Sequence, residues 1–281
     1  MAPDKTGKTS AALSVALAHA KSDAPGKIIW LDTDNKADIL LYRYPELRDK
    51  VEIHTIFDWL GLRAATTEVN DLRKRVTKDD WLIGDVYGYA WHFVQEFVTE
   101  AMYQMPVEDY DEMVDRKRAQ AAEIKMTTPE AKRTAEQNEV VKFANDHGFG
   151  GRTGDYWQEV ARRHRGWEMK FIMSLPCHIL LTTHEKTIIE RAAKAGQTVK
   201  DFGDEFGSRF DEWGVRPDGS KATVSRVKTV GQLRRLRTGG VILNTIDNGG
   251  DDVKGLDVSD TFAGGGGFAE DFLVNVRGWS K

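Results

Sequence analysis

The chain has 281 residues, and a composition of 40% hydrophobic and 30% charged residues supplies enough apolar material for one large domain or for a core domain with an insertion. This composition excludes a globally disordered chain. The formal net charge of −4 excludes an overall basic field that would draw the protein to nucleic acid, so such contact requires a local basic patch.

In chain order, an Ala- and Leu-rich segment at 8–20 lacks Gly and Pro and predicts a helix. Short apolar runs predict strands, which we expect at 27–32, 51–56, 81–86, 177–183 and 241–246. Helical patterns separate most of these runs. Strands that alternate with helices indicate an α/β fold, with a mostly parallel sheet flanked by helices.

The segment 106–154 differs from its surroundings, because charges of both signs are dense there and apolar residues are sparse. We expect a charged helical insertion, in which Thr-Thr-Pro-Glu at 127–130 has the form of a helix start. Apolar residues at helical spacing in 155–175 predict a helix that packs on the sheet. The tail 247–281 is rich in Gly and Asp and predicts loop, with a terminal strand at 272–279.

The only cysteine, Cys177, lies in an apolar run and predicts one buried thiol. A single thiol excludes a disulfide framework and a cysteine-rich zinc site. The first twenty residues contain no apolar block typical of a signal peptide, and no long apolar run follows. These features indicate a soluble, cytoplasmic protein without a membrane partner.

The first residues resemble a phosphate-binding loop, G-x-x-x-x-G-K-[ST], in the window 2–9. Ala2 replaces the first Gly, while Gly7, Lys8 and Thr9 fit the pattern. Gly7 lets backbone N–H groups approach phosphates, Lys8 offers a charge to them, and Thr9 offers a hydroxyl to Mg²⁺. The alternative is an exposed basic turn that caps an ordinary helix.

A loop of this kind normally follows a buried strand, and Gly7 lies only six residues after Met1. We therefore expect that the first strand of the fold is missing from the chain. The consequence would be a recognisable fold whose phosphate site is poorly supported.

Polar residues follow three of the predicted strands, at the edge where α/β sheets bind ligands. Asp32 and Asp34 follow the first strand, and Asp85 ends the strand at 81–86 as in a Walker B motif. Thr183 and His184 follow the strand at 177–183. Each has a structural alternative, since Asp34 can cap the next helix, Asp85 a turn, and His184 can be a surface histidine. Their order along the chain favours a nucleotide site.

The series A-P-x-x-x-G-K-T, L-D-T-D, the Asp85 strand and L-P-x-x-I-L-L-T-T-H-E resembles RecA-type ATPases. Within these it is most similar to phage-encoded P-loop ATPases related to the Sak-type single-strand annealing proteins. The turn P-x-G-x-K at 217–221 is also similar to that group. The resemblance covers most of the chain outside 106–154 and the tail. It implies a RecA-like core.

The resemblance also implies roles. The nucleotide-binding residues would be Asp4, Lys5, Thr6, Gly7, Lys8, Thr9 and Ser10, with Mg²⁺ held by Thr9 and Asp85. Asp34 would activate the attacking water, a position at which relatives usually carry Glu. Thr183 and His184 would sense the γ-phosphate. Together with Lys8 and Asp85, these three would be the catalytic residues.

A basic segment at 225–240 contains no acidic residue. It offers candidates for single-stranded DNA contact, or for a finger that reaches a neighbouring subunit of a homo-oligomer: Arg226, Lys228, Arg234, Arg235 and Arg237. The alternative is a solvated strand face. The acidic turn after 246 departs from the relatives and weakens the expectation of DNA contact there.

The predicted function is an ATPase that hydrolyses ATP with Mg²⁺ in phage-type DNA recombination or replication. A second hypothesis is a nucleotide-binding module with little turnover. A third is a packaging ATPase of the terminase type, which would carry Glu after the Walker B Asp. Val86 occupies that position and argues against it.

Overall fold

The computed structural model describes residues 1–2, 6–22, 25–147, 152–187, 214–224, 226–246, 253–262 and 267–275. The chain divides into two compact units. The first combines Met1–Trp91 with Trp167–Lys281, and the second is His92–Gly166. The charged insertion predicted at 106–154 lies inside the second unit, whose limits are wider.

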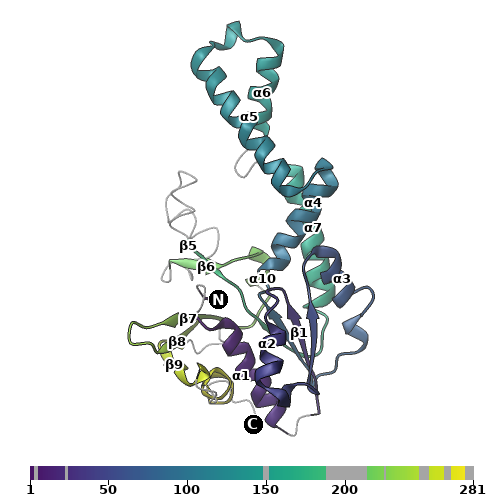
Figure 1. The fold of residues 1–281 in the computed structure, drawn as a ribbon, viewed down its shortest axis with the longest axis vertical. Coiled ribbons are helices and arrows are strands. Elements are labelled where there is room, and N and C mark those ends of the chain that lie inside the picture. Colours follow the sequence, from purple (N-terminus) through teal and green to yellow (C-terminus); the bar gives the residue numbers. More distant parts are fainter. Residues whose placement is uncertain are drawn as a thin grey trace. The chain divides into compact units, whose positions relative to one another are not determined.

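A parallel four-stranded sheet forms the centre of the first unit, with strand order β2-β1-β3-β4 (Figure 1). Four of the predicted strands are confirmed, as β1 (Ile28–Asp32), β2 (Val51–Thr55), β3 (Trp81–Asp85) and β4 (His178–Leu181). The fold is therefore α/β with a central parallel sheet flanked by helices, an arrangement compatible with a Rossmann-like fold.

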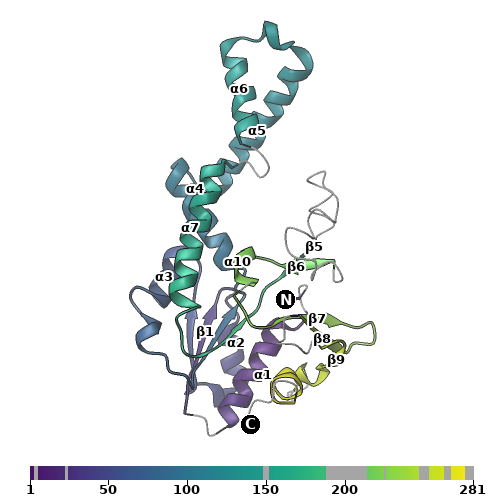
Figure 2. The same cartoon turned by 180° about the vertical axis from the view of Figure 1, so that it is seen from behind.

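Burial explains the sequence of each strand. Every residue of β1 and β3 is buried, which is why both strands are continuous apolar runs. The outer strands β2 and β4 are only partly buried. The chain steps from β1 to β2 through α2 and back to β3 through α3, so right-handed crossovers place these helices on opposite faces (Figures 1 and 2).

The helices of the first unit begin with α1, which confirms the helix predicted at 8–20. Its buried alanines allow close packing. Helices α4 and α7 each extend from one unit into the other. The α-helices that begin or end in this unit are α1 (Lys8–Lys21), α2 (Ala37–Arg43), α3 (Trp59–Thr66), α4 (Tyr89–Tyr103), α7 (Gly154–Phe171) and α10 (Lys221–Val224). The short 3-10 helices are η1 (Pro45–Leu47), η2 (Leu72–Lys74) and η5 (Ser259–Phe262).

A second sheet is antiparallel and contains β7 (Val230–Arg235), β8 (Val241–Ile246) and β9 (Leu256–Asp257). The strand predicted at 241–246 is thus real but does not belong to the parallel sheet, because a tight turn joins it to β7 as a hairpin. The terminal strand predicted at 272–279 is wrong where the structure describes it, since Phe268–Val274 forms a π-helical segment, η6. The remaining residues of that prediction, 276–279, lie outside the described part.

One apolar core lies beneath both sheets. Helix α1 contributes Leu13 and Leu17, the parallel sheet contributes Trp30 and Ile83, and the antiparallel sheet contributes Leu233. Phe268 and Phe272 of η6 pack into the same core, 5.5 Å apart between ring centroids. The two sheets therefore share one core, although no ladder joins them within the described residues.

A short ribbon follows β4. It pairs β5 (Glu185–Thr187) with β6 (Val215–Pro217) in an antiparallel arrangement. The long segment between these strands, 188–213, lies outside the described residues. The turn at 217–221, quoted above for its similarity to a known family, follows β6 directly.

The second unit is helical. Its helices α5 (Val107–Thr127) and α6 (Ala135–Asp146) pack against each other, with η3 (Glu130–Lys132) between them. The helix start predicted at 127–130 is wrong, because α5 continues through Thr127 and α6 begins after a capping box of Thr134 and Gln137. Arg152 lies 4.7 Å from the ring centroid of Tyr110 and pairs with Asp111.

No helix within the described residues is both long and apolar enough to cross a membrane. Cys177 is half-buried at the start of β4. Burial raises the pKa of its thiol to about 11, so little thiolate is present at neutral pH.

Candidate functional site

The predicted phosphate loop ends in the geometry that such a loop requires. Gly7 has a φ of 106° and is the N-cap of α1, a left-handed conformation that favours glycine. Its carbonyl accepts the N–H of Ala11 at 2.8 Å and so starts the helix. Thr6 is buried and Ser10 half-buried. Asp4 and Lys5, the other predicted loop residues, lie outside the described part of the chain.

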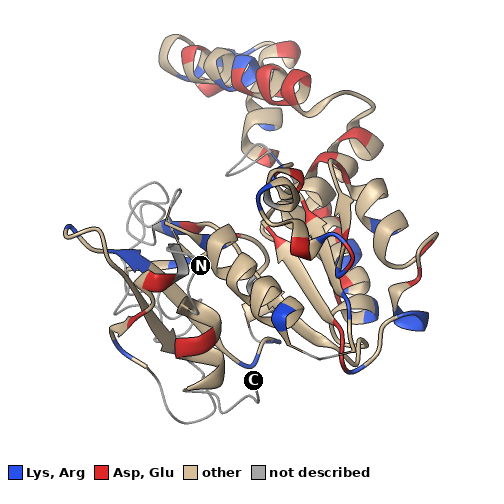
Figure 3. Cartoon of the chain, turned by 60° about the horizontal axis from the view of Figure 1, so that its bottom comes forward, with Lys and Arg blue, Asp and Glu red and all other residues tan. Residues whose placement is uncertain are grey.

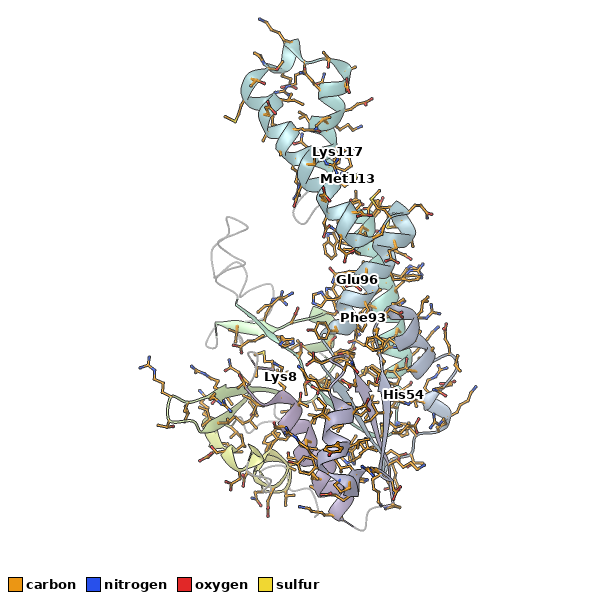
Figure 4. The ribbon with its side chains drawn as sticks, in the orientation of Figure 1. Lys8, His54, Phe93, Glu96, Met113 and Lys117 are labelled. Atoms are coloured by element: carbon orange, nitrogen blue, oxygen red, sulfur yellow. The ribbon has the colours of Figure 1, made fainter. Side chains whose placement is uncertain are left out.

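Lys8 occupies the first turn of α1 and is buried, with its side chain labelled in Figure 4. Its Nζ donates to the carbonyl oxygen of Ala2 at 3.1 Å and lies 3.1 Å from Nδ1 of His184. An ammonium group only donates, so Nδ1 can take part in this contact only as the acceptor. The edge of Tyr89 packs on this ring, with centroids 5.9 Å apart. Two predicted residues from distant parts of the chain, Lys8 and His184, therefore meet.

Asp85 ends β3 and is 2% exposed. The hydroxyl of Thr182 donates to its carboxylate, and the hydroxyl of Thr9 lies close enough to lower the pKa of Asp85. Burial raises the pKa of Asp85, and the nearby charges of Asp32 and Asp34 act in the same direction. The structure thus brings together Thr9 and Asp85, the two residues predicted to hold Mg²⁺. Thr182 is a contact that the sequence did not single out.

Asp32 ends β1 and is also 2% exposed, but it has a different role. Its carboxylate accepts backbone N–H groups of Asp34, Lys36 and Ala37 at 3.2, 2.9 and 2.8 Å. These bonds fix the turn that leads into α2 and satisfy the N–H of Ala37, its first residue. The helix-capping role considered for Asp34 therefore belongs to Asp32, and the carboxylate of Asp34 remains available at the edge of the sheet.

Asp34 forms an ion pair with Lys36, with side-chain exposures of 27% and 59%. The Asp34 carboxylate raises the pKa of Lys36, and Asp85 and Tyr89 contribute in the same direction. Lys36 thus adds a positive charge close to both carboxylates. The spacing of residues in the sequence does not predict that Lys36 lies beside these carboxylates, because a turn of the chain brings it there.

The ends of β1 and β3 are tied together by Thr33. Its N–H donates to the carbonyl of Asp85 at 2.9 Å, and its hydroxyl bonds both the N–H and the carbonyl of Val86 at 2.8 Å. Asp32 and Asp85 are register partners in the ladder. The relative position of the two strand ends is therefore fixed by several hydrogen bonds.

The end of β4 supports a turn from the β5–β6 ribbon. Thr183 Oγ1 donates to the carbonyl of Asp218 at 2.7 Å, and the N–H of Asp218 donates to the carbonyl of His184 at 2.8 Å. Lys186 pairs with the Asp218 carboxylate at 2.6 Å. A Cβ at Gly88 would lie 2.6 Å from Thr183 Oγ1, so only glycine fits there. The hydroxyl of Thr183, predicted to sense a γ-phosphate, holds this turn in the structure.

The basic candidates do not form one stripe. Arg226 pairs with Glu168, which is completely buried and also accepts from the hydroxyls of Tyr87 and Thr223. Its guanidinium is therefore engaged within the fold, which makes it a weak candidate for phosphate contact. Lys228 lies near His178, whose pKa is lowered chiefly by burial and also by this lysine.

Arg234, Arg235 and Arg237 are exposed on the β7–β8 hairpin, whose tip is basic in Figure 3. Leu236, between them, is 43% exposed. These three arginines remain candidates for contact with a polyanion or a second subunit.

Within the described residues, no group of three His, Cys, Asp or Glu side chains is arranged to hold a metal ion. A Mg²⁺ ion shared with phosphates needs fewer protein ligands, because it usually keeps several waters. The Thr9 hydroxyl beside the buried Asp85 carboxylate fits that requirement.

Comparisons with known proteins do not assign a function to the chain, so the functional assignment depends on the geometry of this site. No family model matches the chain, and no curated protein is significantly similar to it.

Proposed function

We propose that the chain binds ATP with Mg²⁺ through a RecA-like P-loop site and hydrolyses it. The observation that carries the proposal is the position of Thr9, in the first turn of α1, beside Asp85 at the end of β3, close enough for its hydroxyl to lower the pKa of the Asp85 carboxyl. These residues lie more than seventy positions apart in the printed sequence. A hydroxyl and a carboxylate in contact, at the N-terminus of a helix that follows a left-handed glycine, form a suitable environment for a phosphate-bound Mg²⁺.

Each neighbouring group suits one part of the triphosphate. The first turn of α1 directs backbone N–H groups and the positive end of the helix towards an anion. Lys8 would exchange its contacts with Ala2 and His184 for phosphate oxygens. Mg²⁺, when bound, would neutralise phosphate charge beside Thr9 and Asp85.

Asp34 is the proposed residue that orients the attacking water. Among the carboxylates at this edge, Asp32 is occupied by backbone N–H groups and Asp85 by hydroxyls. Asp34 forms its ion pair with Lys36, whose side chain is exposed. Lys36 would have to turn away before Asp34 could accept a proton from water.

We further propose that the activity serves DNA recombination or replication in a homo-oligomer. Support comes from the exposed Arg234, Arg235 and Arg237. The hydrogen bonds of Met1 and Ala2 imply that β7 runs parallel to β4, which places Arg234 and Arg235 towards the same edge as Lys8. Single-stranded DNA or an adjacent subunit would contact these arginines.

A binding module with little turnover is the second candidate. It is favoured by the docked state of Lys8, whose contacts with Ala2 and His184 must break before phosphate binds. It is also favoured by the ion pair that engages Asp34.

The test is a thermal-shift titration with ATP and Mg²⁺, followed by phosphate release with and without single-stranded DNA. Lys8→Ala should weaken ATP affinity by about 100-fold, since removing one partner of a buried charge pair costs roughly 2–5 kcal/mol. Lys21→Ala is the matched control, because Lys21 lies in the same helix but is exposed in its last turn. No ATP-dependent shift in the unmodified protein would refute both candidates. A shift without turnover would select the binding module.

A further inference from the structure

A fully buried carboxylate of the first unit has no part in the proposed chemistry. Glu168 lies near the end of α7 and has no exposed surface. It accepts the hydroxyl of Tyr87 at 3.0 Å and the hydroxyl of Thr223, and it pairs with Arg226. A buried carboxylate is costly unless it is paired and hydrogen-bonded, so the fold gains by keeping these partners in place. The partners come from two separate parts of the chain, one after β3 and one after β6.

The first partner connects Glu168 to the end of β3. Tyr87 follows Asp85 and Val86 in the sequence, and its N–H donates to the carbonyl of Thr182 at 2.7 Å. The hydroxyl of Thr182 donates to the Asp85 carboxylate. Burial raises the pKa of the Tyr87 hydroxyl, which therefore stays protonated and donates to Glu168. Glu168 thus helps to fix the backbone that immediately follows the Asp85 strand.

The other two partners belong to the segment that follows β6. Helix α10 contains Thr223, and Arg226 lies just beyond its end. The N–H of Arg226 donates to the carbonyl of Thr223 at 3.0 Å, so a turn brings both side chains to the same carboxylate. The side chain of Arg226 is only 11% exposed, and salt therefore screens this ion pair much less than a surface pair.

The start of the same segment contacts the end of β4. The N–H of Asp218 donates to the carbonyl of His184 at 2.8 Å, and the carbonyl of Asp218 accepts the hydroxyl of Thr183 at 2.7 Å. Gly219 has a φ of 119°, a conformation that favours glycine. A Cβ at Gly88 would lie 3.2 Å from the carbonyl oxygen of Asp218. The turn at Asp218 is therefore packed directly on the backbone that leads into α4.

The segment is thus attached at both of its ends. Asp218 and Arg226 are close in the sequence, so the attachment of Arg226 to Glu168 limits the positions that Asp218 can reach. His184, which Asp218 contacts, has its Nδ1 3.1 Å from Nζ of Lys8. A series of direct contacts therefore connects the buried carboxylate with the lysine of the candidate phosphate loop.

We propose that Glu168 and Arg226 are positioning residues of the candidate site. Their ion pair holds the turn at Asp218 against His184, and neither side chain touches nucleotide. Without the pair, the turn would leave the end of β4 more often, and His184 would no longer be held in one place beside Lys8. A displacement of about 1 Å at a reacting site can cost about 100-fold in rate. The effect on turnover rests on the proposed function, whereas the attachment of the turn does not.

The test measures amide hydrogen exchange at Asp218 in the full chain without nucleotide. Arg226→Ala should speed this exchange at least about tenfold, while the amides of β3 stay protected. Because Arg226→Ala leaves a buried carboxylate unpaired, Thr223→Val is a second and milder variant that keeps the ion pair, and it should speed exchange about threefold. If β3 also loses protection in Arg226→Ala, Thr223→Val decides. Arg165→Ala removes an exposed arginine of α7 and is the matched control, which should leave exchange unchanged.

Phosphate release is then measured in the same variants at saturating ATP. Arg226→Ala should lower it at least about tenfold, and Thr223→Val less, while the ATP-dependent thermal shift persists. A role in packing alone would lower stability without separating turnover from ATP binding in this way.

Unchanged exchange at Asp218 in the folded variants would overturn the proposal. So would faster exchange together with undiminished phosphate release, because the turn would then not position the site. If the unmodified protein releases no phosphate, the proposed function fails, and exchange at Asp218 by itself decides whether the ion pair holds the turn. The two failures are therefore distinguishable.

Discussion

The ends of β1 and β3 carry two carboxylates that are alike in their position in the sheet and in their burial. Asp32 and Asp85 are register partners on adjacent parallel strands, and each is 2% exposed. They differ in what donates to them. Asp32 accepts three backbone N–H groups, whereas Asp85 accepts the hydroxyl of Thr182 and has the hydroxyl of Thr9 close by.

This difference shows that the type of donor, more than burial, separates a structural carboxylate from one that can bind a ligand. Backbone N–H groups at the start of α2 cannot turn away without unwinding the helix. Hydroxyls rotate freely, so Thr9 and Thr182 can exchange a bond to Asp85 for a bond to water or to a metal ion. Asp32 therefore stabilises the fold, and Asp85 is free to change partners.

The largest expected effect on stability follows from removing the structural carboxylate. Asp32→Ala should lower the free energy of unfolding by about 3 kcal/mol, because it leaves several N–H groups at the start of α2 without an acceptor. Urea unfolding followed by circular dichroism measures this change. Asp32→Asn is the control, since it keeps one acceptor oxygen and should lose less.

A loss below about 1 kcal/mol for Asp32→Ala would mean that water replaces the carboxylate easily. Asp32 would then resemble Asp85, and the comparison between the two strand ends would fail.

A smaller change in the free energy of unfolding, of opposite sign, is expected when Asp85 at the end of β3 is replaced. Burial raises the pKa of Asp85 above the ordinary value of 3.8 for an aspartate side chain. The stabilising contribution of its protonated form is complete below pH 3.8 and is lost as the pH rises through the folded-state pKa. At pH 7 the ionised carboxylate thus destabilises the ligand-free fold, and Asp85→Asn should be more stable than the unmodified protein.

The difference in unfolding free energy between Asp85→Asn and the unmodified protein should shrink as the pH falls towards 4. Asp32→Ala provides the contrast, since it should be destabilised at pH 7. Asp85→Asn should also abolish any Mg²⁺-dependent turnover. A variant that is less stable at pH 7 would show that the Asp85 carboxylate is needed by the fold.

Much of the parallel sheet was predictable, because β1 and β3 are buried on both faces and their sequences are unbroken apolar runs. The meeting of Thr9 with Asp85 and of Lys8 with His184 was also predictable, since carboxyl ends of parallel strands share one edge. The placement of 241–246 was not, because an apolar run has the same form in a parallel strand and in a hairpin.

Other features of the fold and the site could not be predicted, because they depend on three-dimensional contacts that leave no pattern in the sequence. Asp32 and Asp34 are two residues apart, and only the path of the chain into α2 decides which one caps it. Arg226 belongs to a basic run, yet a buried acid on α7, Glu168, engages it. The helical pattern of 268–274 was hidden by its β-branched and aromatic residues, which also suit a strand.

The smallest effect on stability, together with a large effect on activity, is expected for Asp34→Asn. Within the described residues its ion pair is with the exposed Lys36, so stability should change by less than about 0.5 kcal/mol. If Asp34 orients the attacking water, phosphate release should fall by about 100-fold or more while ATP still produces its thermal shift. Asp38→Asn, at an exposed site in α2, is the control. Unchanged turnover would leave Asp34 as no more than a partner for Lys36. The contrast between Asp32 and Asp85 requires that a carboxylate of this edge serves either stability or activity. Unchanged turnover and unchanged stability in Asp34→Asn would break that rule.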